Sequence, residues 1–236
     1  FGVGSPVGNN LLPTVTEVHV ASGAVLDVNN IQQTVGALSG SGNVLLGSGK
    51  LTVNSTANST FSGTINGSGG SFTKSGNFNL TLAGVNSYTG PTTVNGGTLT
   101  AGAVGAFPAN STFTLDNAAI AMGSFDNTIS NLTGSGVVSL DGATLTLQGA
   151  SNWAFDGQIV GNGGLTKTGA GTLTLTGTAS FSGEMRITEG GLRLASFIVP
   201  VVPGLYEGRV DGNLNYTTPN PNTSIQLSPR YGNIVD

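Results

Sequence analysis

Four aspartates in the second half of the chain are the residues best suited to do chemistry: Asp116, Asp126, Asp141 and Asp156. Paired carboxylates cleave glycosidic bonds when they lie ~5–10 Å apart, one as acid and one as base or nucleophile. A separation of 10 to 15 residues would let two of them meet on neighbouring turns of a coiled chain. Each one precedes Asn or Gly, however, as in a turn where Asp bonds its own backbone. We therefore expect turn residues and not a polysaccharide lyase or hydrolase.

Nucleophilic and metal chemistry find less support in the sequence. His19 is the single histidine and is flanked by Val18 and Val20, whereas a catalytic triad or a zinc site needs partners around it. The chain has no cysteine, and the glycine-rich calcium nonapeptide is absent. We expect His19 to be an exposed strand residue, and we expect no catalytic site, no metal site and no cofactor.

Two lysines recur at one position of two similar segments, FTKSG with Lys74 and LTKTG with Lys167. A lysine at such a position could form an isopeptide bond with an Asn or Asp side chain. The alternative is a solvated lysine on a turn that guards a sheet edge against association. We favour the solvated lysine.

The charge balance excludes two classes of partner. Seven Lys and Arg stand against eleven Asp and Glu, and only Lys50, Lys74 and Lys167 precede residue 186. Nucleic-acid binding and polybasic membrane-surface binding both need concentrated positive charge. The longest apolar run, residues 197–202, is far shorter than the ~20 residues of a membrane span. We expect no nucleic acid and no membrane span.

The elements that must position these residues come from an internal repeat. Residues 35–53 align with 129–147 at an offset of 94, and residues 72–90 align with 165–183 at an offset of 93. The first copy has Gly47 and Ser62 where the second has Asp141 and Asp156. The repeat divides the chain into an N-terminal extension, two modules and a tail, which span residues 1–14, 15–102, 103–196 and 197–236.

Short alternating runs within each module, such as Leu80-Thr81-Leu82, are typical of half-buried strands. Gly, at 39 of 236 residues, punctuates these runs where the chain turns. Few aromatics argue against a β-sandwich. The sequence therefore predicts an all-β parallel solenoid of eight or nine coils, ~40 Å long, with about four coils per module. We expect Leu38 and Leu132, and likewise Leu80 and Leu173, in equivalent inward positions.

The segment from Gly161 to Ala195 has a regular pattern of glycines, leucines, one lysine and one aromatic residue, and a weaker copy spans Gly69 to Ala101. The residues of the pattern are Gly163, Gly164, Leu165, Lys167, Gly169, Gly171, Leu173, Leu175, Gly177, Phe181, Gly183, Gly191 and Leu192. This pattern resembles the autotransporter-associated β-strand repeat. The resemblance implies a right-handed parallel β-helix of the passenger type, extracellular or on the surface of a bacterial cell, without a common catalytic site.

The tail, residues 197–236, departs from the repeat and holds five of the nine prolines. Its segment from Pro203 to Asn215 is faintly similar to the start of a PA14-type domain, which implies that the chain was cut from something longer. Forty residues without disulfides bury too little surface to fold alone. We expect the tail to dock on a solenoid end or flank through apolar residues, namely Phe197, Ile198, Val199, Val201, Val202, Leu205 and Tyr206.

These patterns predict a non-catalytic extracellular structural protein. A solenoid has two open ends that need caps, and the sequence indicates no polar cap. End-to-end stacking into a filament or a surface layer is therefore the leading hypothesis, with another copy of the chain as the partner. The alternative is an adhesin fragment that binds a glycan or a host protein along its length.

Overall fold

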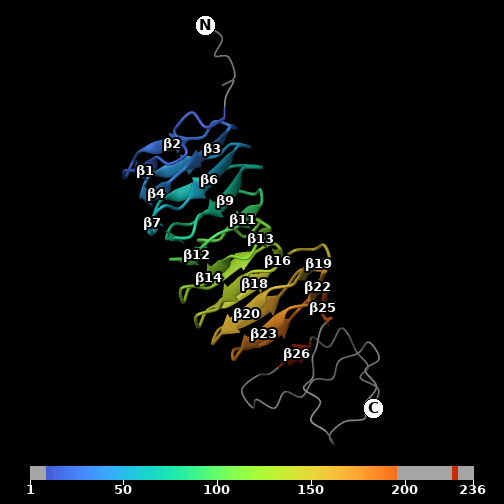
Figure 1. The fold of residues 1–236 in the computed structure, drawn as a ribbon. Coiled ribbons are helices and arrows are strands. Elements are labelled where there is room, and N and C mark those ends of the chain that lie inside the picture. The colour runs from blue at the N-terminus through green and yellow to red at the C-terminus, as the bar shows by residue number, and fades with distance from the viewer. Residues whose placement is uncertain (1–8, 196–224, 228–236) are drawn as a thin grey trace, which may run out of the picture.

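The computed structural model describes residues 9–195 and 225–227, which form strands and turns without a helix (Figure 1). The strands stack as nine coils, and all strand pairings are parallel. The predicted parallel solenoid and its coil number are confirmed. No helix in the described ranges is long and apolar enough to cross a membrane.

Each coil visits three faces in turn, named here the first, second and third face. The first face consists of β1 (Glu17–Val20), β4 (Ala37–Gly40), β7 (Ser59–Phe61), β10 (Asn79–Leu82), β12 (Thr98–Ala101), β14 (Ala119–Ala121), β17 (Val137–Ser139), β20 (Gln158–Gly161) and β23 (Thr178–Phe181). The third face consists of β3 (Gln32–Val35), β6 (Lys50–Asn54), β9 (Ser71–Ser75), β11 (Thr92–Val94), β13 (Phe113–Leu115), β16 (Leu132–Gly134), β19 (Trp153–Phe155), β22 (Thr172–Leu175) and β25 (Gly191–Leu194).

The second face is divided into two sheets. They are β2 (Val25–Asp27), β5 (Asn43–Leu45) and β8 (Thr64–Asn66), and then β15 (Asn127–Ile129), β18 (Thr144–Leu147), β21 (Gly164–Lys167), β24 (Met185–Ile187) and β26 (Ile225–Leu227). Between them, residues 83–91 and 102–112 cross this face without a strand. Buried Asn86 and Asn127 replace part of the missing ladder: Asn86 Oδ1 accepts from Ile65 N at 2.8 Å, and Asn127 Oδ1 accepts from Phe107 N at 3.0 Å.

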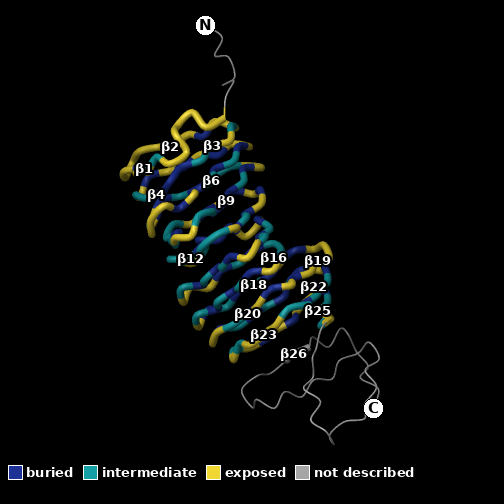
Figure 2. The backbone as a smooth tube through the Cα atoms, viewed as in Figure 1, coloured by how far each residue is buried: buried dark blue, intermediate teal, exposed yellow. Residues whose placement is uncertain are grey.

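The core is a continuous column of inward side chains, and Figure 2 marks the buried residues in dark blue along the backbone of the coils. Strand alternation sends every second residue inward. Thr81 and Thr174 accordingly face out, while the leucines on either side of them are buried. Leu38, Leu132, Leu80 and Leu173 are all fully buried, so their inward orientation is confirmed.

The two modules do not occupy equivalent faces, which corrects the expectation that Leu38 and Leu132, and likewise Leu80 and Leu173, occupy equivalent positions. Leu38 lies on β4 of the first face, whereas its counterpart Leu132 lies on β16 of the third face. The same change of face separates Leu80 on β10 from Leu173 on β22. A coil takes about 20 residues, so an offset of 93–94 residues covers four coils and two further faces. Because a coil has three faces, a shift of two faces forward is the same as a shift of one face backward. The second module is therefore turned by one face relative to the first.

The N-terminal end of the solenoid is capped from within the chain, contrary to the expectation of no polar cap. Asn9 Oδ1 accepts from Gln32 N at 2.9 Å, and Asn10 Oδ1 accepts from Thr34 N at 2.7 Å. Asn10 N also donates to Gln32 O at 2.8 Å. These side-chain amides pair the open edge of β3 in place of a further strand.

Candidate functional site

The predicted docking residues of the tail, Phe197 to Tyr206, lie outside the described residues. The described part of the tail is β26, whose backbone pairs in parallel with β24, with Gln226 opposite Arg186. The second face therefore accepts a tail strand at its C-terminal end.

Three of the four candidate aspartates form hydrogen bonds to residues of a neighbouring coil. Asp126 Oδ1 accepts from Thr144 N at 2.6 Å, and Asp141 Oδ2 accepts from Gly123 N at 3.2 Å. Asp156 accepts from the Thr176 hydroxyl on the next coil, and the Asp116 carboxylate accepts from the Asn117 side-chain amide at 3.4 Å. Asp126, Asp141 and Asp156 thus bond neighbouring coils, where the sequence suggested that each would bond its own turn. No hydrogen bond among the described residues joins two of these carboxylates.

His19 is exposed on β1, as predicted, and its Nδ1 lies 3.1 Å from Ser39 Oγ on the next coil. Within residues 9–195, no group of three or more His, Asp or Glu side chains is placed to hold a metal ion.

Lys74 is fully buried, so the expectation of a solvated lysine was wrong. It follows Phe72 by two positions on β9, and the two-residue period of a strand turns both side chains inward. Its Nζ donates to three backbone carbonyl oxygens, those of Ser75, Gly76 and Gly96, each at 2.9 Å. Burial lowers the pKa of Lys74 to about 8. The signal was present in the alternation, where a lysine stands at an inward position.

Lys167 is likewise buried, on β21, and lies in a different environment. Its Nζ donates to Gly169 O and lies 4.9 Å from the centre of the Trp153 ring, a cation–π distance. Burial lowers the pKa of Lys167, and the nearby Glu189 carboxylate opposes this shift. Among residues 9–195, neither ammonium bonds an Asn or Asp side chain, which is the partner that an isopeptide bond requires.

A buried chain of hydroxyl groups was not predicted from the sequence. Tyr88 Oη lies 2.7 Å from Thr92 Oγ1, which lies 2.8 Å from Ser111 Oγ. Ser111 Oγ donates to Gly90 O at 2.8 Å and ends the chain. The second module has Phe181 in place of Tyr88 and Met185 in place of Thr92, so neither of these two hydroxyl groups recurs there.

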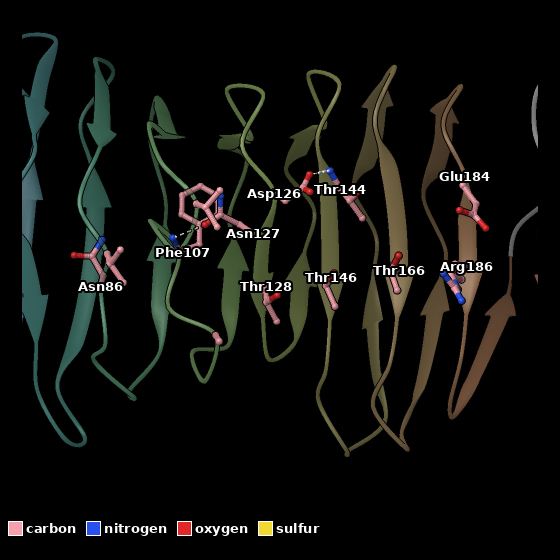
Figure 3. Close-up of a pocket in the computed structure, with 14 residues that line it drawn as sticks. Asn86, Phe107, Asp126, Asn127, Thr128, Thr144, Thr146, Thr166, Glu184 and Arg186 are labelled. Atoms are coloured by element: carbon pink, nitrogen blue, oxygen red, sulfur yellow. Dashed lines mark hydrogen bonds between the residues drawn. The ribbon is translucent and has the colours of Figure 1, made fainter.

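An open groove of about 580 Å³ runs along the second face across several coils (Figure 3). Its floor is a ladder of outward side chains in register, Thr128, Thr146, Thr166 and Arg186. Glu184 lies near Arg186 at one end, and residues of the strandless crossings line the other end. Those residues include Val85 and Val104, which are 62% and 63% exposed. The groove therefore offers hydroxyls, one guanidinium, the carboxylates of Asp126 and Glu184, and an apolar end.

Comparison with known proteins identifies the two repeats. The family model of the passenger-associated-transport-repeat matches residues 72–101 and residues 165–194. These ranges contain Lys74 and Lys167 at the same position of each match. No curated protein and no solved structure matches the chain.

Proposed function

We propose that this chain, with two passenger-associated-transport repeats, is a structural region of an exported passenger that is displayed outside a bacterial cell. The observation that carries the proposal is that both repeats lie in one unbroken stack of nine coils. Parallel strands joined by inter-coil hydrogen bonds hold this stack together without any disulfide. Such a column can hold other parts of a protein away from the membrane.

The display proposal is testable because the chain has no cysteine. Ser68 lies exposed in the turn between β8 and β9. In intact producing cells, a Ser68→Cys variant should react with a membrane-impermeant maleimide. A matched Val138→Cys variant places the thiol in the buried core and should stay unlabelled. Labelling of Ser68→Cys that appears only after cell lysis would contradict surface display.

We also propose that copies associate through the C-terminal end. The N-terminal end carries the Asn9 and Asn10 cap, whereas β24 accepts β26 as an added parallel strand. The same edge would accept a strand from another copy, and residues 197–236 would supply the docking surface. Truncation after Ser196 should abolish filaments or larger assemblies in negative-stain images. Equal assembly by the truncated and full chains would argue against this route.

The groove on the second face favours an adhesive role as a second candidate function. Its threonine hydroxyls are in register on successive strands and repeat at the strand spacing of ~4.8 Å, so no bulky side chain lies between them on the floor of the groove. We propose a glycan as the ligand, held by these hydroxyls and by Arg186. An Arg186→Ala variant should lose binding to a glycan array, whereas Arg193→Ala on the third face should not. Equal glycan binding by the two variants would exclude the groove as the glycan-binding site.

A further inference from the structure

Within the part of the chain that the structure describes, the Lys74 ammonium bonds only backbone oxygens. Ser75 ends β9 and Gly76 begins the corner after it, and Gly96 lies in the corresponding corner one coil later. An ammonium group has three N–H donors, and each one has one carbonyl partner at 2.9 Å. The side chain therefore fastens two successive corners of the solenoid through its charge.

This arrangement has the chemistry of a monovalent-cation site. Backbone carbonyl oxygens that converge on one point replace the hydration shell of potassium-sized cations. Ammonium has a similar size and, in addition, donates hydrogen bonds to such oxygens. Since the pKa of Lys74 remains near 8, its Nζ carries a charge at neutral pH.

We propose that the carbonyl oxygens of Ser75, Gly76 and Gly96 form a binding site for a small monovalent cation, which the Lys74 ammonium occupies. The side chain is thus a tethered cation, and the site persists when the tether is removed. A chain that lacks the lysine side chain but keeps the three oxygens takes up free ammonium or potassium at this corner.

The second repeat supports the proposal that the oxygens at this corner, and not the lysine side chain, make the cation site. The 93-residue offset takes Gly76 to Gly169, whose carbonyl also accepts from a lysine. It takes Gly96 to Glu189, whose carboxylate raises the pKa of Lys167 against the effect of burial. In both copies, the groups at this corner stabilise one buried ammonium, through carbonyl dipoles in the first copy and through a carbonyl and a carboxylate in the second.

The test compares two variants in two salts. Lys74→Ala leaves the three oxygens and an empty space, whereas Lys74→Met fills the space with an uncharged side chain. Ammonium chloride should raise the melting temperature of Lys74→Ala by about 2–4 °C over equal tetramethylammonium chloride, at roughly five times the dissociation constant. The unaltered protein and Lys74→Met should show no such difference. Equal melting temperatures of Lys74→Ala in the two salts would overturn the proposal.

A second measurement uses the unaltered chain, in case Lys74→Ala does not fold. Nitrogen-15 NMR of the lysine ammonium groups at neutral pH should show slowly exchanging protons on Lys74 Nζ. Lys50, which is partly exposed on β6 and has no such oxygens around it among the described contacts, is the control and should exchange fast. Fast exchange of the Lys74 ammonium protons would contradict occupancy of the site.

Discussion

At the scale of the residue, whether a side chain is buried depends more on its inward or outward position along the strand than on its chemical type. Lys74, Lys167 and Thr92 occupy inward positions and are buried, although each is polar. Their polar atoms are satisfied locally, by carbonyls or hydroxyls of neighbouring corners. Burial without such partners would cost several kcal/mol for a charge.

The first residue-scale prediction concerns pH and Lys74. Its pKa of about 8 in the folded chain lies below the ~10.4 of an unfolded lysine. Between these values the unfolded chain binds more protons, so the contribution of Lys74 to the unfolding free energy rises with pH. Urea titrations should show the unaltered chain gaining about 1–2 kcal/mol over Lys74→Met between pH 8 and 10. Parallel pH profiles of the two proteins would contradict this.

The second residue-scale prediction concerns the buried hydroxyl chain of Tyr88, Thr92 and Ser111. Tyr88→Phe removes the bond to Thr92 Oγ1 but leaves Thr92 paired with Ser111. The unfolding free energy should fall by about 1 kcal/mol. A double-mutant cycle with Thr92→Val in urea measures the coupling, which should be of similar size. Additive losses in the two single variants would show that the bond contributes nothing.

The third residue-scale prediction concerns the candidate aspartates Asp141 and Asp156. Asp141 has a left-handed backbone with φ of 48°, which Asn tolerates, and an amide oxygen can still accept from Gly123 N. Asp141→Asn and Asp156→Asn should each cost about 1 kcal/mol or less. Polysaccharide cleavage by the unaltered chain that disappears in the double variant would instead make these residues catalytic.

At the scale of the element, corner glycines stack closely from coil to coil. Gly42, Gly63 and Gly84 lie after strands of the first face, and their counterparts Gly136, Gly157 and Gly177 lie after strands of the third face. A Cβ added at Gly177 would overlap the carbonyl oxygen of Gly157. These columns therefore set the close approach of successive corners.

A pair of glycine variants tests this element. Gly177→Ala should lower the unfolding free energy by about 3 kcal/mol or more, because backbone must move to make room. Gly191→Ala is the matched control, since its added Cβ would meet Thr172 side-chain atoms, the nearest at 3.0 Å. Its cost should stay near 1 kcal/mol in the same urea titration. Similar losses at the two sites would show that corner stacking is not the cause.

The sequence predicted the strands and the inward leucines, because the two-residue alternation is local. It could not predict which face each strand joins, because that depends on the summed length of every corner between Leu38 and Leu132. The alternation places Lys74 at an inward position, but the sequence could not show what stabilises its charge there, since the three carbonyls come from two different coils. The Asn9 cap was missed for the same reason, because its partner Gln32 is a coil away.

At the scale of the whole molecule, the repeat and the solenoid have different periods. The two passenger-associated-transport repeats are separated by four coils and two faces, so one sequence motif is presented in two directions. Thr73 lies on the third face, while its counterpart Thr166 lies on the second, in the floor of the groove. A partner that recognises the outer surface of the repeat would therefore meet it on two sides of the column.

The most direct test of this account is the stacking of Thr93 on Thr114, two outward residues in register on β11 and β13. Cα atoms of stacked parallel strands lie ~4.8 Å apart, within the range that a disulfide spans. Because the chain has no cysteine, mild oxidation of the double variant Thr93→Cys/Thr114→Cys should give one intramolecular disulfide, detected by mass spectrometry. The pair Thr93→Cys/Thr133→Cys is separated by one further coil and should stay reduced. A reduced first pair, or a disulfide in the second, would contradict the parallel solenoid.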